Sequence, residues 1–296
     1  MKAVRALLCT MRPGQWVKNL FVFAPAVFAK EHSQVHPEVF LLAALGTLVF
    51  ILLSGAVYVM NDVLDVERDR LHPVKRLRPL ASGQMSVQTA VAGGLLALAS
   101  AYAIGTYLGG GFILIATGYL VLNVAYSSKL KRYAYLDVLS IATGFLLRVL
   151  AGSLAIGLER QEISVYLIAC TFLLALFLGL GKRRHELATL GGEDEARRPA
   201  LRQYRLDHLD IALVCVAVAT VVVYGFYTVA PQTRAYFGTT RLAATIPFVP
   251  VGIGRFLVLL RRKGEVRSPT DVMVKDVWFL LDIAAWAAVV AWAVYG

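Results

Sequence analysis

Long blocks without charged residues dominate the pattern of this chain. Residues 39–61 form one block of 23 uncharged residues, residues 163–181 form one of 19, and residues 211–233 form one of 23. Residues 79–128 form a further block of 50, which three consecutive glycines divide at 109–111. Because a helix that crosses a bilayer needs roughly 20 predominantly apolar residues, each block can cross once and the longest can cross twice.

The blocks predict an all-α membrane protein whose helices form a single domain over residues 1–296. Uninterrupted blocks of this length favour helices over a barrel, whose strands alternate apolar and polar residues over about ten positions. We expect nine membrane-spanning helices around a central cavity that opens to the cytoplasm. The predicted spans are 14–30, 38–61, 87–106, 111–127, 134–157, 162–181, 209–229, 241–261 and 275–295.

The first predicted span is the least regular. Only 11 residues separate Lys18 from Lys30, and Pro25 lies among them. This span is therefore expected to tilt, or to begin at the membrane interface with Trp16 as an anchor.

Composition and charge exclude a soluble protein and indicate the orientation. The chain is 58% hydrophobic and 17% charged, against about 25% charged in soluble domains. Of the Lys and Arg residues in the loops and near the ends of the predicted spans, 24 fall on the side of the N-terminus and 4 on the other. By the positive-inside rule, the N-terminus and the long loops face the cytoplasm, in a cell (plasma or inner) membrane. Topology and anionic lipid thus explain the net charge of +11 without a nucleic-acid partner.

Three carboxylates stand together where the second predicted span ends. Asp62, Asp65 and Asp69 are spaced three and four residues apart, so on a continuing helix they would share one face. Mg²⁺ prefers oxygen ligands and often combines one or two carboxylates with water and substrate phosphates. The spacing is compatible with a magnesium site or with a solvated helix end.

Cations follow these carboxylates directly. Lys75 and Arg78 lie three residues apart, after His72 and Pro73. Carboxylates for a metal beside cations for phosphate oxygens are what a metal-bound, phosphorylated substrate requires. The alternative is an ordinary basic cytoplasmic loop.

Two arginines lie within predicted spans. Arg148 shares a helix face with Asp137 in the fifth span, and we leave two roles open for it, phosphate binding or pairing with an acid on another span. Arg255 lies close to a basic loop and is expected to extend its charged group to the membrane surface.

The assembled motif resembles the UbiA superfamily of intramembrane prenyltransferases over nearly the whole chain. It reads Asn61-Asp62-x-x-Asp65-x-x-x-Asp69, then His72-Pro73-x-Lys75-Arg76-x-Arg78-Pro79 with Gly83, and Tyr126-x-x-Lys129. Within the superfamily the chain is most similar to the decaprenyl-phosphate phosphoribosyltransferases. The marks of that group are Arg12-Pro13-x-Gln15-Trp16-Val17-Lys18-Asn19, Gly181-Lys182-Arg183 with Glu186-Leu187, Pro269-x-Asp271 and Lys275-Asp276.

One departure from the superfamily pattern bears on the substrate. Aromatic prenyltransferases of this fold usually carry a second Asp-x-x-x-Asp motif after the sixth span. Here Lys182 replaces the first carboxylate, and Glu186 lies one turn later, where it can pair with Lys182. We therefore expect one metal site and an additional cation instead of two metal sites.

The resemblance implies a Mg²⁺-dependent transferase that moves a 5-phosphoribosyl group from phosphoribosyl pyrophosphate (PRPP) to a membrane polyprenyl phosphate. It assigns the metal and the catalysis to Asp62, Asp65 and Asp69. The expected substrate contacts are Lys75, Arg78, Tyr126 and Lys129 for the ribosyl donor and Lys18, Arg148 and Lys182 for the lipid phosphate. Asn61 and Glu186 are further expected substrate-binding residues. Homo-oligomerisation is left open.

Two alternatives remain at this point. One is an aromatic prenyltransferase that uses a prenyl diphosphate with a hydroxybenzoate or quinone precursor as the acceptor. The other is a transporter for an anionic metabolite, against which the clustering of charges at one membrane face argues.

Overall fold

A computed structural model of the chain describes residues 2–28, 38–159, 163–189, 200–261, 272–273 and 275–295. Among these residues all regular secondary structure is helical, with no strand. The chain divides into two compact units. Unit 1 comprises Met1–Ser128 and Leu147–Ile163, and unit 2 comprises Lys129–Leu146 and Ser164–Gly296.

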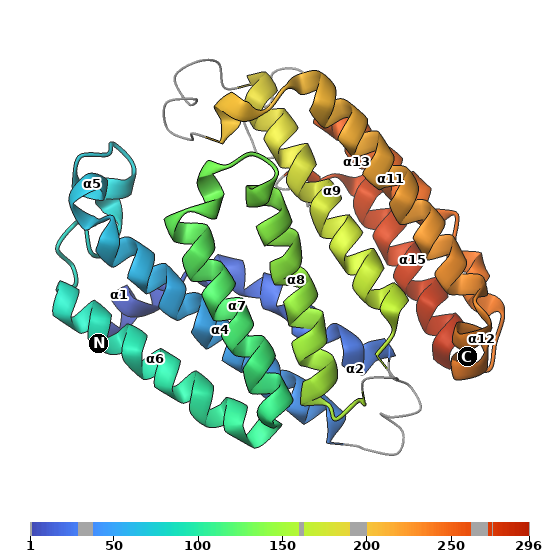
Figure 1. Cartoon of the computed structure of the whole chain (residues 1–296), viewed down its shortest axis with the longest axis horizontal. Coiled ribbons are helices and arrows are strands. Elements are labelled where there is room, and N and C mark those ends of the chain that lie inside the picture. Colours follow the sequence, from blue (N-terminus) through green and yellow to red (C-terminus); the bar gives the residue numbers. More distant parts are fainter. Residues whose placement is uncertain are drawn as a thin grey trace. The chain divides into compact units, whose positions relative to one another are not determined.

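Unit 1 contains the N-terminal helices and the acidic motif. Two of its long helices, α4 and α6, pack along each other, and α7 packs against both (Figure 1). Their core includes Phe50, Phe112 and Tyr119. The elements are α1 (Lys2–Thr10), the 3₁₀ helix η1 (Pro13–Val22), α2 (Ala24–Phe28), α4 (Val39–Leu64), α5 (Val66–Arg70), η2 (Lys75–Leu77), α6 (Val87–Leu108) and α7 (Gly110–Ser128).

Unit 2 contains the helices of the C-terminal half. Here α9 packs on α11, and α13 packs on α15 (Figure 1). Phe177 and Phe256 meet in its core with ring centroids 5.1 Å apart. The elements are η3 (Leu130–Arg132), the first half of α8 (Leu136–Ala155), α9 (Val165–Thr189), η4 (Leu201–Gln203), α11 (Leu206–Val229), α12 (Pro231–Phe237), η5 (Arg241–Thr245), α13 (Phe248–Leu260) and α15 (Val277–Tyr295).

The helices confirm that this is an integral membrane protein. Among the described residues, eight segments are long and apolar enough to cross a bilayer, and they correspond to the second through ninth predicted spans. The break that we expected at the three glycines lies at Gly109, whose φ is +102°, a value that glycine adopts without steric cost.

The first predicted span is not one continuous helix. Its residues form η1 and then the short helix α2, with Phe23 between them, while residues 29–30 lie outside the described part. Contacts with α8 fix η1 in this position. Asn19 accepts a hydrogen bond from Arg148 Nε at 2.9 Å. One turn further along α8, a Cβ built on Gly152 would lie 2.0 Å from the carbonyl oxygen of Val22. The close approach of η1 therefore requires glycine at position 152.

Candidate functional site

The acidic motif lies across a helix break. Helix α4 ends at Leu64, and α5 begins at Val66. Asp65 occupies the junction with φ −99° and ψ 4°, so the single continuing helix that the spacing predicted is interrupted here. The Asp69 N–H still donates to the Asp65 carbonyl at 2.8 Å, which keeps these two residues one turn apart.

Asp62 and Asp69 are buried beneath cations. Their exposed fractions are 3% and 1%. Arg78 Nη1 bridges them, lying 3.1 Å from Asp62 Oδ1 and 2.5 Å from Asp69 Oδ2. Asp62 Oδ1 also accepts a hydrogen bond from Arg12 Nη2 at 2.7 Å, and Lys75 Nζ lies 3.8 Å from Asp69 Oδ1. A buried carboxylate is costly unless paired and hydrogen-bonded, and these cations supply the pairing.

Asp65 is more accessible than the other two carboxylates. It is half-buried, and its ion pair is with the highly exposed Arg68, 3.3 Å away. Such exposed pairs are worth about 0–1 kcal/mol, so an incoming ligand can readily displace this one.

No three His, Cys, Asp or Glu side chains lie together as a metal site in the described part of the chain, and the assignment of all three aspartates to the metal stays a prediction. Two carboxylates still suit Mg²⁺, which often uses only one or two. Asp69 Oδ1 is buried without a hydrogen-bond partner, and Asp65 lies one turn away. Asp62 is instead engaged by two arginines. The carboxylates of Asp65 and Asp69 therefore suit a metal ion, whereas the carboxylate of Asp62 pairs with Arg12 and Arg78.

Most of the other residues predicted for substrate binding lie near helix ends. Asn61 is half-buried in the last turn of α4, and Tyr126 is half-buried in the last turn of α7. Lys129 is exposed in the turn after α7, and Lys18 is exposed on η1.

Arg12 is a site residue that our sequence reasoning missed. The sequence pattern identified Arg12 only as part of the motif shared with the family and gave it no role in the site. In the structure its guanidinium contacts Asp62 and lies 4.7 Å from the ring centroid of Tyr58. The Arg-Pro pair between α1 and η1 was the available signal. Nothing in the spacing shows that this segment reaches a carboxylate 50 residues away.

A second buried ionic cluster lies in unit 2. Arg183 on α9 pairs with Asp137 on α8, with Nε to Oδ2 at 2.6 Å, and with Glu186, with Nη1 to Oε2 at 2.5 Å. The Tyr204 hydroxyl donates to Asp137 Oδ1 at 2.5 Å and accepts from the Tyr135 N–H at 2.7 Å. This cluster therefore joins α8, α9 and the segment at η4.

Burial, together with the hydrogen bond to Asp137, raises the pKa of Tyr204 above its usual value. Its hydroxyl consequently remains a donor to Asp137 at neutral pH. The hydroxyl also holds the backbone at Tyr135, whose φ of +64° is uncommon for a residue other than glycine.

The motif around Lys182 and Glu186 on α9 forms a different ion pair from the one that the spacing predicted. The ion pair that the structure gives Glu186 is with Arg183, so the predicted Lys182–Glu186 pair is not confirmed. Lys182 itself is exposed, while Arg183 is buried. The buried cation at this motif is thus Arg183, and the role of the exposed Lys182 stays a prediction.

The two arginines within spans have defined contacts. Arg148 is buried and donates to the Asn19 side chain and, at 2.7 Å, to the Tyr119 hydroxyl. These two contacts hold Arg148 within unit 1, and its assignment to a phosphate stays a prediction. Arg255 forms two hydrogen bonds, of 2.9 and 2.7 Å, with Asp276, which directly precedes α15, and its extension to the membrane surface stays a prediction. Asp271, which belongs to the motifs shared with the family, lies outside the described residues.

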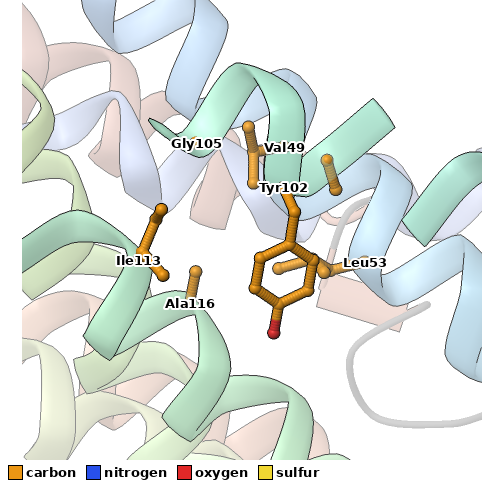
Figure 2. Close-up of a pocket in the computed structure, with 7 residues that line it drawn as sticks. Val49, Leu53, Tyr102, Gly105, Ile113 and Ala116 are labelled. Atoms are coloured by element: carbon orange, nitrogen blue, oxygen red, sulfur yellow. The ribbon is translucent and has the colours of Figure 1, made fainter. Parts of the chain in front are cut away.

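An apolar pocket lies apart from these ionic clusters, among α4, α6 and α7 of unit 1. Its empty volume of about 170 Å³ includes space that is open to the surroundings. Tyr102 presents its ring to the pocket (Figure 2), and its hydroxyl is 3.0 Å from Thr117 Oγ1. The walls carry no charged group for a phosphorylated ligand. They are formed by Val49, Leu53, Ala101, Tyr102, Gly105, Ile113 and Ala116.

Comparisons with known proteins agree on one family. The model of the UbiA prenyltransferase family matches residues 19–269. The chain is 30% identical to the decaprenyl-phosphate phosphoribosyltransferase of Mycolicibacterium smegmatis, covering 99% of this chain and 93% of that protein. It is 31% identical to the decaprenyl-phosphate phosphoribosyltransferase of Mycobacterium tuberculosis strain H37Rv, covering 98% and 95% respectively.

The fold also matches a solved structure. A UbiA homolog from Archaeoglobus fulgidus bound to GPP and Mg²⁺ superimposes with a TM-score of 0.67, covering 98% of this chain and 100% of that chain. Its sequence is 20% identical, so this likeness concerns the fold.

Proposed function

The chain belongs to the UbiA prenyltransferase family and is a transferase, and from that premise we propose that it transfers a 5-phosphoribosyl group from PRPP to a membrane polyprenyl phosphate. Diphosphate is the leaving group. The names of its relatives support a phosphoribosyl group as the transferred group and a polyprenyl phosphate as the acceptor.

The observation that carries the proposal is the combination of carboxylates and cations at the end of α4. Asp69 has a buried oxygen without a hydrogen bond, and Arg78 and Lys75 lie at the same carboxylate. A diphosphate bound with a divalent metal needs acidic oxygens for the metal and basic groups for the phosphates. Both are present within one cluster of unit 1.

Each group in the cluster has a proposed task. Asp65 and Asp69 would hold Mg²⁺, with Asn61 beside them at the end of α4. When bound, the metal supplies positive charge that stabilises the departing diphosphate. Lys75 and Arg78 donate to the phosphate oxygens of PRPP, while Asp62 keeps the Arg78 guanidinium in place. Tyr126 and Lys129 are assigned to the donor as well.

The acceptor requires no general base in this chain. A polyprenyl phosphate is already anionic, so one of its oxygens can attack the anomeric carbon of ribose directly. The bond from that carbon to diphosphate breaks as the new carbon–oxygen bond forms, with inversion at the carbon. We assign Lys18 and Lys182, both exposed cations, to the acceptor phosphate.

Release of diphosphate by the purified protein tests the proposal. We expect release only when PRPP, polyprenyl phosphate and Mg²⁺ are all present, and we expect EDTA to stop it. Release at the same rate without the lipid would show hydrolysis of PRPP instead of transfer, and would contradict the proposed acceptor.

The orientation in the membrane is a separate prediction. Because Lys and Arg concentrate on one side, reporter fusions after residues 75, 195 and 265 should all be cytoplasmic, which would place the carboxylate cluster at the cytoplasmic face. Fusions near residues 108 and 235 should report the opposite side. A cytoplasmic signal at either of these two sites would contradict the proposed topology.

Lys182→Ala tests the assignment of Lys182 to a phosphate. Loss of a charge-assisted contact that acts in the transition state lowers the rate by about 10²-fold or more, so we expect a loss of this size in phosphoribosyl transfer. Lys182→Arg should retain part of the rate because it keeps the charge. Since Lys182 is exposed, thermal unfolding of both variants should match the wild type. Unchanged turnover of Lys182→Ala would remove Lys182 from the mechanism.

A further inference from the structure

The cations over the carboxylate cluster are more exposed than the acids beneath them. Arg12 is 35% exposed and Arg78 is 30% exposed, whereas Asp62 is almost fully buried. Together with Lys75, these groups place three positive charges over two buried negative ones. Arg12, Arg78 and Lys75 are therefore accessible cations of the cluster, beside the accessible Asp65.

The two guanidinium groups retain unused hydrogen-bond capacity. An arginine side chain has five N–H donors. Within the described residues, Arg12 makes one side-chain hydrogen bond, from Nη2 to Asp62. Arg78 makes both of its bonds through Nη1. Asp62 thus holds both guanidinium groups while most of their donors remain available to an anion.

The position of Arg12 is fixed by its backbone as well as by Asp62. Its φ of 57° and ψ of 71° lie in the left-handed region, which is uncommon for residues other than glycine. Such a conformation costs about 1–3 kcal/mol and persists where the surroundings impose it, often at functional sites. Pro13 follows at the start of η1, and the guanidinium lies over the ring of Tyr58. Tyr58 and Asp62 are one turn apart on α4, so Arg12 lies along one face of that helix.

We propose that Arg12 binds the diphosphate of the donor, and that Asp62 positions Arg12 and Arg78 for this contact. The inference rests on the proposed function and extends it. Asp69 Oδ1, buried and without a hydrogen bond, marks the metal side of the same cluster, and Arg12 provides a second guanidinium on the phosphate side. The ligand class is a diphosphate carrying a divalent cation.

Binding measurements on the purified full-length protein separate this role from a structural one. The probes are inorganic diphosphate with excess Mg²⁺, and Mn²⁺ alone. We expect Arg12→Gln to weaken binding of the Mg²⁺–diphosphate complex by about tenfold or more, because hydrogen bonds to charged groups are worth about 1.5–3 kcal/mol. Binding of Mn²⁺ alone should be unchanged or tighter, since a nearby positive charge has been removed.

A double-mutant cycle then tests the positioning by Asp62. Asp62→Asn should also weaken Mg²⁺–diphosphate binding, and the double variant with Arg12→Gln should lose less than the two single losses combined. Arg68→Gln is the matched control, because Arg68 pairs only with the accessible Asp65 in the described part of the chain. The affinity of the Arg68→Gln variant for Mg²⁺–diphosphate should be within about twofold of that of the wild type.

The outcomes distinguish this inference from the proposed function. If the wild type binds Mg²⁺–diphosphate but Arg12→Gln binds it equally well, the role of Arg12 is contradicted and the proposed function stands. Equal weakening of both probes would assign Arg12 to the structure of the site. A wild type that binds neither probe would contradict the inference and the proposed function together. If Arg12→Gln does not fold, Arg12→Lys, which retains the charge but not the planar guanidinium, is expected to show a smaller loss of the same kind.

Discussion

Asp69→Asn should lower phosphoribosyl transfer by about 10³-fold, the largest effect on activity that we expect from a single substitution. The amide keeps the size of the side chain but removes the charge that both Mg²⁺ and Arg78 require. Because Asp65 lies one turn away and is accessible, Asp65→Asn should produce a comparable loss. For both variants, the Mg²⁺ concentration that gives half-maximal rate should rise. Initial rates across a Mg²⁺ titration measure both quantities.

Asp62→Asn is the matched comparison for these two variants. Asp62 contacts Arg12 and Arg78, so its loss should raise the KM for PRPP while leaving the Mg²⁺ concentration for half-maximal rate within about twofold. A shift in Mg²⁺ response for Asp62→Asn as large as that for Asp69→Asn would return Asp62 to the metal site. Near-normal rates for Asp65→Asn and Asp69→Asn would remove the carboxylates from the reaction.

Arg183→Ala should cause the largest loss of stability. Removing one partner from a buried ionic cluster costs about 3–5 kcal/mol, and here it leaves Asp137 and Glu186 in the protein interior without their shared cation. Thermal unfolding in detergent should show a clearly lower midpoint.

The neighbouring arginine provides the control for that experiment. Arg184 pairs with Asp210, whose side chain is 44% exposed, so Arg184→Ala should cost no more than about 1 kcal/mol. Adding Glu186→Gln to Arg183→Ala should restore part of the midpoint, because it removes one of the two buried negative charges that Arg183 pairs with. Equal midpoints for Arg183→Ala and Arg184→Ala would contradict the structural role of the cluster.

The spans could be predicted from the sequence because the hydrocarbon core of a bilayer requires every backbone polar group to be hydrogen-bonded within the protein. A long uncharged block has few alternatives to a membrane helix, and Gly109 marks the one break within the longest block. The first predicted span shows the limit of this reasoning. Its apolar content is adequate, but contacts of Asn19 and Val22 with α8 decide the shape of η1, and such contacts are set by distant residues.

The cluster of carboxylates and cations could be predicted from the sequence, but the pairing within it could not. The spacing of Asp62, Asp65 and Asp69 indicated one face of a helix, yet the break at Asp65 and the arginines over Asp62 separate their environments. Sequence spacing likewise suggested that Glu186 pairs with Lys182. Both Lys182 and Arg183 lie within one turn of Glu186, so spacing alone does not select the partner. Arg183 is the cation buried with Glu186 because it also pairs with Asp137 on α8.

The fate of the two halves of PRPP tests the proposed reaction most directly. PRPP labelled with radioactive carbon in its ribose and with radioactive phosphorus in its diphosphate is incubated with the purified protein, Mg²⁺ and a polyprenyl phosphate. Phosphoribosyl transfer predicts that the carbon label enters the organic phase with the lipid while the phosphorus label stays in water as diphosphate. Both labels remaining in water, while a prenyl diphosphate is consumed to prenylate 4-hydroxybenzoate, would contradict the account and identify an aromatic prenyltransferase.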